Sequence, residues 1–171
     1  MNYTIADDFD ATPARYWEMF FDEAYNEALF RHLRIGRQVL EFSREGEGDA
    51  LVIRRKQILT PQREAPAIFQ KLIKGAITYT EQNVFKAREN RMTAETIPGF
   101  GADKLTTRGV YRLEALGPNK VRRYWEGECT CRVPLLGSKV EKAIVDEVKA
   151  SYRDTTEFTR KWLAEHSSTG R

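Results

Sequence analysis

The stretch Val133–Glu141 reads Val-Pro-Leu-Leu-Gly-Ser-Lys-Val-Glu, and it marks the point where an apolar strand turns into a long helix. Ser138 and Glu141 have the spacing of a capping box, in which the hydroxyl accepts an orphan backbone N–H and the carboxylate reaches back to the cap. We therefore expect Ser138 to cap a helix that continues to at least Trp162.

Apolar residues recur along this predicted helix at near-helical spacing, and charged residues fill the other face. They are Val140, Ile144, Val148, Tyr152, Phe158 and Trp162. A helix of about 25 residues spans roughly 37 Å, which is enough to cross a curved sheet. Because predicted strands precede the helix, we expect the first four of these residues to face a sheet.

The upstream sequence predicts strands and short helices in a fixed order. Residues 2–10 alternate as a strand does, after which Thr12 offers an N-cap and Pro13 suits the first helical position. Residues 13–32 then read as two short helices or one bent element. Glycine- and proline-rich turns separate the later runs. The predicted strands cover 34–42, 51–59, 76–87, 90–97, 104–115 and 120–133, with a short helix or a loop at 66–74.

This order of elements is typical of an α+β fold. Consecutive strands joined by short turns should pair as an antiparallel meander, and the last helix should lie across one face of that sheet. A curved sheet wrapped around one helix leaves a space between them, which is the candidate binding site. A length of 171 residues favours a single domain over 1–171.

Composition excludes several classes of function. The net charge of +3 comes from 28 basic and 25 acidic residues, so the surface is balanced and predicts no nucleic-acid partner. No run of about 18 apolar residues occurs, which argues against stable membrane insertion. The segment Met1–Asp8 has neither the basic start nor the apolar core of a signal peptide. We therefore expect a cytoplasmic location.

The two cysteines, Cys129 and Cys131, are expected to be structural. At positions i and i+2 of a strand their Cα atoms lie roughly 6.6 Å apart and their side chains run parallel, which is a poor disulfide geometry. No second thiol pair or nearby histidine completes a zinc site. We expect both side chains to be buried, reduced and slow to react.

Two stretches resemble the START-like, or helix-grip, superfamily, which includes pollen-allergen-like proteins, polyketide cyclases and lipid-transfer domains. They are Asp22–Tyr25, after the first helix, and Gly127–Glu141, which is most similar to an uncharacterised bacterial branch. The order of elements also resembles that superfamily over nearly the whole chain. The resemblance implies a cavity between the sheet and the C-terminal helix that holds an apolar small molecule. It implies no catalytic residue, because the superfamily shares a fold rather than one reaction.

Strand alternation indicates which side chains face that cavity. Inward-facing positions on the predicted strands and the last helix give a set of candidate ligand-binding residues: Tyr79, Glu81, Tyr111, Arg123, Trp125 and Tyr152. An inward Glu81 or Arg123 would be costly without a partner. Either residue could instead lie at a strand end or on the solvated face, the two could pair structurally, or they could orient a polar group of the ligand.

The sequence contains no strong catalytic or cofactor motif, so we expect no cofactor and no metal. The histidines, His32 and His166, have no nucleophile or carboxylate pattern near them, and no phosphate-binding or dinucleotide fingerprint occurs. Phe100 lies between Gly99 and Gly101 on a predicted loop, where it could gate the cavity or tuck against the sheet edge.

Three functions are compatible with these observations. The first is binding or carriage of a hydrophobic small molecule, such as a lipid, a polyketide or an isoprenoid. The second is an enzyme of the polyketide cyclase or dehydratase kind that uses the same cavity. The third is a protein whose cavity is vestigial and whose surface binds another protein. Tyrosine and arginine at ordinary pKa are weak acid–base catalysts near neutral pH, which favours binding.

Overall fold

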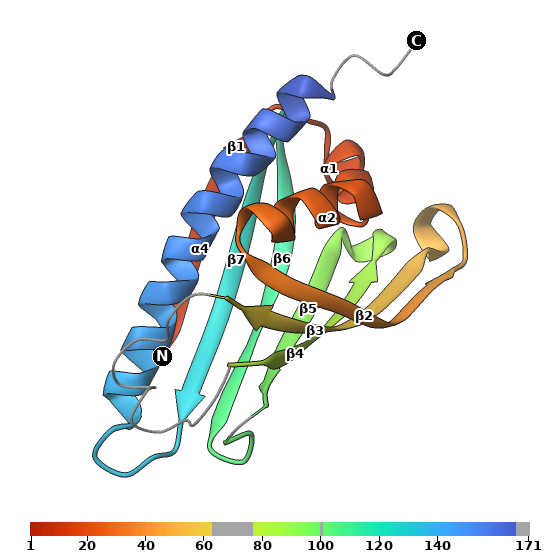
Figure 1. Ribbon diagram of the computed structural model, residues 1–171. Helices are drawn as coiled ribbons and strands as arrows, with labels where there is room; N and C mark the ends of the chain where they lie inside the picture. Colours follow the sequence, from red (N-terminus) through yellow and green to blue (C-terminus); the bar gives the residue numbers. More distant parts are fainter. Residues whose placement is uncertain (63–76, 100, 167–171) are drawn as a thin grey trace.

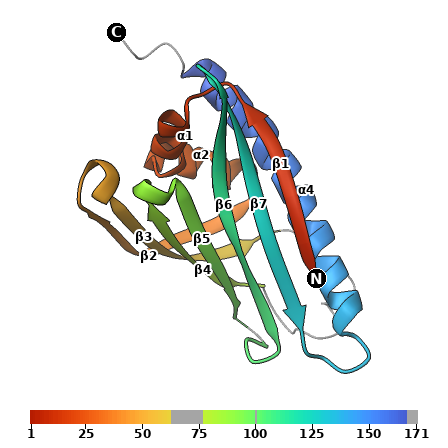
Figure 2. The same cartoon turned by 180° about the vertical axis from the view of Figure 1, so that it is seen from behind.

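The computed structural model describes residues 1–62, 77–99 and 101–166, which form one antiparallel sheet and three α-helices (Figures 1 and 2). The strands are β1 (Asn2–Phe9), β2 (Ile35–Glu45), β3 (Val52–Pro61), β4 (Tyr79–Lys86), β5 (Arg91–Pro98), β6 (Leu105–Gly117) and β7 (Lys120–Cys131). The helices are α1 (Pro13–Phe20), α2 (Glu23–His32) and α4 (Gly137–Glu165), with 3₁₀ turns η1 (Gly48–Ala50) and η2 (Ala87–Glu89). The helix or loop expected at 66–74 and Phe100, with its two alternative roles, lie outside the described residues.

The strand order β1-β7-β6-β5-β4-β3-β2 confirms the predicted meander. Strands β2 to β7 pair with their neighbours in sequence, and β1 is added at the free edge of β7. The α+β class is confirmed as well, because both short helices follow β1 and the long helix comes last. Among the described residues, no helix has the length and apolar character needed to cross a membrane.

Residues 13–32 form two helices because each has its own N-cap. The Thr12 hydroxyl accepts the backbone N–H of Arg15 at 3.1 Å, and Pro13 occupies the first helical position, as predicted. The Asp22 carboxylate accepts the N–H of Tyr25 at 2.8 Å and starts the second helix. The chain therefore breaks between Phe20 and Glu23 rather than bending.

The long helix α4 runs to Glu165, as predicted, but the expected capping box at its start is wrong. The helix begins at Gly137 with Leu136 as its N-cap, so Ser138 lies inside the first turn and caps nothing. Glu141 instead accepts the backbone N–H of Cys131 at 2.8 Å. The reason is tertiary. A Cβ on Gly137 would lie 2.5 Å from the Cys131 carbonyl oxygen, so the turn folds tightly against the end of β7.

Helix α4 packs along β7 and β1, and α2 lies between α4 and β2 (Figure 1). Val140 is buried, and Ile144, Val148 and Tyr152 pack on a cluster of sheet residues that includes Trp125. The predicted sheet-facing stripe is therefore confirmed. Helix α4 therefore covers the β1–β7 end of the sheet, and α2 approaches the β2 end.

Candidate functional site

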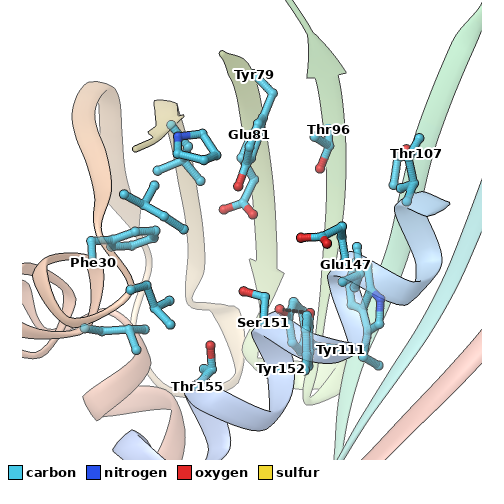
Figure 3. A pocket seen from close by; sticks show the side chains of 18 of the residues that line it. Phe30, Tyr79, Glu81, Thr96, Thr107, Tyr111, Glu147, Ser151, Tyr152 and Thr155 are labelled. Carbon is cyan, nitrogen blue, oxygen red and sulfur yellow. Dashed lines mark hydrogen bonds between the residues drawn. The ribbon is translucent and has the colours of Figure 1, made fainter. Parts of the chain in front are cut away.

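A cavity of about 350 Å³ lies between the concave face of the sheet, α2 and α4. Most of its wall is apolar or aromatic, which is typical of sites for hydrophobic small molecules. Figure 3 shows side chains converging on this space from α2, from the sheet and from α4. The apolar part of the wall includes Leu29, Phe30, Leu33, Leu59, Ile77, Pro98, Leu105 and Val148.

All six candidate residues line this cavity. Tyr79 and Glu81 come from β4, Tyr111 from β6, Arg123 and Trp125 from β7, and Tyr152 from α4. Sheet register brings Tyr111 of β6 opposite Trp125 of the next strand, β7. Figure 3 shows Tyr79 and Glu81 reaching in from β4, while Tyr152 reaches in from the helix.

An aromatic cluster forms the part of the wall nearest to α4. The rings of Tyr111 and Trp125 are 4.6 Å apart, and the ring of Tyr152 stacks on Tyr111 at 6.1 Å. The hydroxyls of Tyr111 and Tyr152 share a hydrogen bond, and the Trp125 indole N–H donates to the Tyr3 hydroxyl at 3.2 Å. Burial raises the pKa of both Tyr111 and Tyr152 well above its usual value. Both hydroxyls therefore stay protonated near neutral pH.

Arg123 is 2% exposed and makes its ion pair with Asp7, not with Glu81. One of its terminal nitrogens donates to the Tyr16 hydroxyl at 3.2 Å, and the other donates to Asp7 and to Thr156. Burial alone lowers the pKa of this guanidinium, but the surrounding hydroxyls and Asp7 outweigh that effect and raise it. Arg123 is a fixed cation whose charge is balanced inside the protein.

Glu81 belongs to a second polar network, on the β3 and β4 side of the cavity. Its carboxylate accepts from the Gln57 amide at 2.9 Å and lies 3.8 Å from the Arg55 guanidinium. Arg55 also donates to Asn83 at 3.0 Å and to Asn26 at 3.1 Å, and burial lowers its pKa. Glu81 and Arg123 therefore each have a structural ion-pair partner, but they do not pair with each other.

The cavity also contains polar residues that the sequence analysis did not single out. Arg55 shares its strand face with Ile53 and Leu59, so the same alternation that identified Glu81 could have found it. Glu147, Ser151 and Thr155 recur every four residues on α4 and form a polar line beside the apolar stripe. Figure 3 shows these three side chains directed into the cavity.

The two cysteines differ in exposure, so the expectation that both are buried is wrong for Cys131. Cys129 is completely buried, whereas Cys131 lies at the end of β7 and is half-buried, and neither forms a disulfide. Burial raises the pKa of the Cys129 thiol. The physical reason for the difference is position, because β7 ends at Cys131 and the chain turns away there.

We expect one thiol per molecule to react with Ellman's reagent in the folded protein, and the second to react only as the protein unfolds. Thiolate formation and reagent access are both suppressed at the buried Cys129. Time-resolved absorbance in buffer and in denaturant measures the two phases. The matched variant Cys131→Ser should lose the fast phase. A fast phase that persists in this variant would show that Cys129 is accessible.

The fold is that of the START-like, helix-grip proteins. The Zhui aromatase/cyclase from Streptomyces sp. R1128 matches 99% of this chain and 96% of its own, with 11% identity and a TM-score of 0.69. A START superfamily protein from Mycobacterium smegmatis matches 96% of this chain and 97% of its own, with 12% identity and a TM-score of 0.60. Norcoclaurine synthase from Thalictrum flavum matches 99% of this chain and 89% of its own, with 13% identity and a TM-score of 0.59.

Within that class, this chain belongs to the family described as "Protein of unknown function (DUF2505)", whose match spans residues 4–163. Comparison with curated proteins finds no match. At identities of 11% to 13%, the structural likeness to these proteins shows the shared fold alone.

Proposed function

We propose that the protein binds or carries a hydrophobic small molecule, of lipid, polyketide or isoprenoid character, in the cavity between the sheet and α4. The observation that carries the proposal is the cavity of about 350 Å³ with its apolar and aromatic wall. Covering such a wall with apolar ligand surface stabilises the complex by about 25 cal/mol per Å² of apolar surface removed from water. The chain would act as one ligand-binding unit, and its free thiols suit a reducing cytoplasm.

The aromatic cluster supports a role in ligand contact. Tyr111, Trp125 and Tyr152 present large rings together with polar atoms that can hold a ligand's polar end. Tyr79 and Glu81 lie across the cavity on β4, so the candidate residues surround the space rather than one corner of it. Arg123 adds a buried guanidinium on the β7 side.

A cyclase or dehydratase mechanism in the same cavity has less support. Such a reaction needs a proton donor and an acceptor whose pKa values lie near the working pH. Burial moves the pKa values of Tyr111 and Tyr152 away from that range, and Arg55 and Arg123 are both paired with carboxylates. These groups suit hydrogen bonding to a ligand better than proton transfer to it.

The proposal predicts that Ser151→Phe weakens binding of the neutral dye Nile red by at least about tenfold, or about 1.4 kcal/mol. Ser151 projects into the cavity from α4, so a phenyl ring there takes up ligand space (Figure 3). Fluorescence titration measures the affinity, and native mass spectrometry of the purified protein tests whether a ligand co-purifies. Ser138→Phe is the matched control, because Ser138 is exposed in the first turn of the same helix.

The control variant should bind the dye as the parent does. Equal binding by parent and Ser151→Phe, with both proteins folded by circular dichroism, would mean that the dye does not enter this cavity. A complete absence of dye binding and of any co-purified ligand in the parent would count against the binding function itself.

A further inference from the structure

The two buried arginines on the cavity wall are already balanced by carboxylates. Arg123 forms an ion pair with Asp7, and Arg55 lies 3.8 Å from Glu81. Arg123 is 2% exposed and Arg55 is 4% exposed. An anionic ligand that enters the cavity would lose its hydration and meet the carboxylates of Glu81 and Glu147, which both line it, yet it would find both of these cations already paired. Burying a charge without a free partner of opposite sign is unfavourable.

The same region retains hydrogen-bond donors that have no acceptor in the described part of the chain. The Arg123 Nε–H is buried and has no partner among the described residues, although both terminal nitrogens of that side chain are bonded. The hydroxyls of Tyr111 and Tyr152 share one hydrogen bond, which uses one of their two hydrogens. Buried donors without partners are rare in native structures, because each has lost its hydrogen bond to water without forming one inside the protein.

We infer that the ligand is a neutral hydrophobic molecule whose polar end is a carbonyl oxygen, and that ionised carboxylates such as fatty acids are disfavoured. A carbonyl oxygen accepts from the tyrosine pair, which lines the cavity, without adding charge to two balanced ion pairs. This inference rests on the proposed function, since it names the class of ligand that the same cavity takes. It separates neutral polyketide-like or isoprenoid-like carbonyl compounds from acidic lipids.

Three probes of similar size test the inference by displacement of Nile red. They are 2-ethylnaphthalene, which has no acceptor, 2-acetylnaphthalene, which has a ketone, and 2-naphthoic acid, which is ionised at neutral pH. We expect the ketone to bind about tenfold more tightly than the hydrocarbon, as one recovered buried hydrogen bond allows. We expect the acid to bind at least about tenfold more weakly than the ketone, because its charge meets Glu81 and Glu147 on the cavity wall.

The variant Glu81→Gln tests the electrostatic part of the inference without creating a void. Loss of this carboxylate leaves Arg55 without its balancing charge, so the affinity for 2-naphthoic acid should rise at least about fivefold while that for the ketone stays within about twofold. The matched control is Glu95→Gln, which removes one carboxylate from an exposed position on the neighbouring strand β5. That control should change neither affinity.

The outcomes separate this inference from the proposed function. If the parent binds the acid as tightly as the ketone, or if Glu81→Gln leaves acid binding unchanged, the ligand class is wrong and hydrophobic binding still stands. If the hydrocarbon binds as tightly as the ketone, the unpaired donors do not select a carbonyl. If none of the three probes displaces the dye, both the ligand class and the proposed binding function are overturned.

Discussion

Replacing Trp125 by Ala is expected to lower the free energy of unfolding by about 3–5 kcal/mol and to weaken the binding of a hydrophobic dye. The indole is 6% exposed and lies over Gly109 of the neighbouring strand, where an added Cβ would be only 2.5 Å from the ring. It also contacts Tyr111 and Tyr152 and donates to the Tyr3 hydroxyl. Truncation therefore removes a large contact area and leaves the Tyr3 hydroxyl without its donor.

Denaturant unfolding and Nile red titration of the same samples measure the two effects. Trp125→Phe is the control, since it keeps an aromatic ring over Gly109 and should cost less in both measurements. Suppose Trp125→Ala binds the dye as tightly as the parent while it unfolds at much lower denaturant. Trp125 would then be a core residue only, and placing the binding surface along β7 would be wrong.

Replacing Arg123 by Met is expected to lower the free energy of unfolding by about 3–5 kcal/mol, because it leaves the Asp7 carboxylate partly buried without its partner. Arg123 is 2% exposed and also holds Tyr16 and Thr156 by hydrogen bonds. The double variant Asp7→Asn with Arg123→Met should recover part of the loss, since it removes both charges. Chemical denaturation of the parent, the single variants and the double variant measures the coupling.

The neighbouring residue provides a close control. Arg122 forms a similar ion pair with Asp8, but its side chain points to the other face of β7 and is 40% exposed. Exposed ion pairs contribute little to stability, so Arg122→Met should leave the denaturation midpoint nearly unchanged. Equal losses for Arg122→Met and Arg123→Met would show that burial does not determine the importance of the pair.

Much of the fold could be predicted from the sequence because it depends on local patterns. The alternation on β4, β6 and β7 and the helical stripe on α4 each identify one face of one element. For this reason the six candidate residues were found on the wall of one cavity. Thr12 and Pro13 likewise predicted where α1 starts, since an N-cap acts within four residues of the helix start.

Prediction from the sequence was wrong where a local motif competed with a tertiary contact. The Ser138 and Glu141 spacing is a good capping box, yet Glu141 bonds to Cys131 because the turn before α4 packs against β7. The exposure of Cys131 has the same origin. Alternation alone gives Cys129 and Cys131 the same face, and only the end of the strand makes them differ.

The polar interior of the cavity was decided by the tertiary structure alone. Arg123 is 116 residues from Asp7 in sequence, and Arg55 reaches Glu81 through the pairing of β3 with β4. A periodic pattern states which way a side chain points, but it does not state which charge lies opposite across the sheet. The sequence by itself therefore determined the order of the elements and six of the residues on the cavity wall. Only the folded chain determined that its charges are balanced, because that balance depends on distances between residues far apart in the sequence.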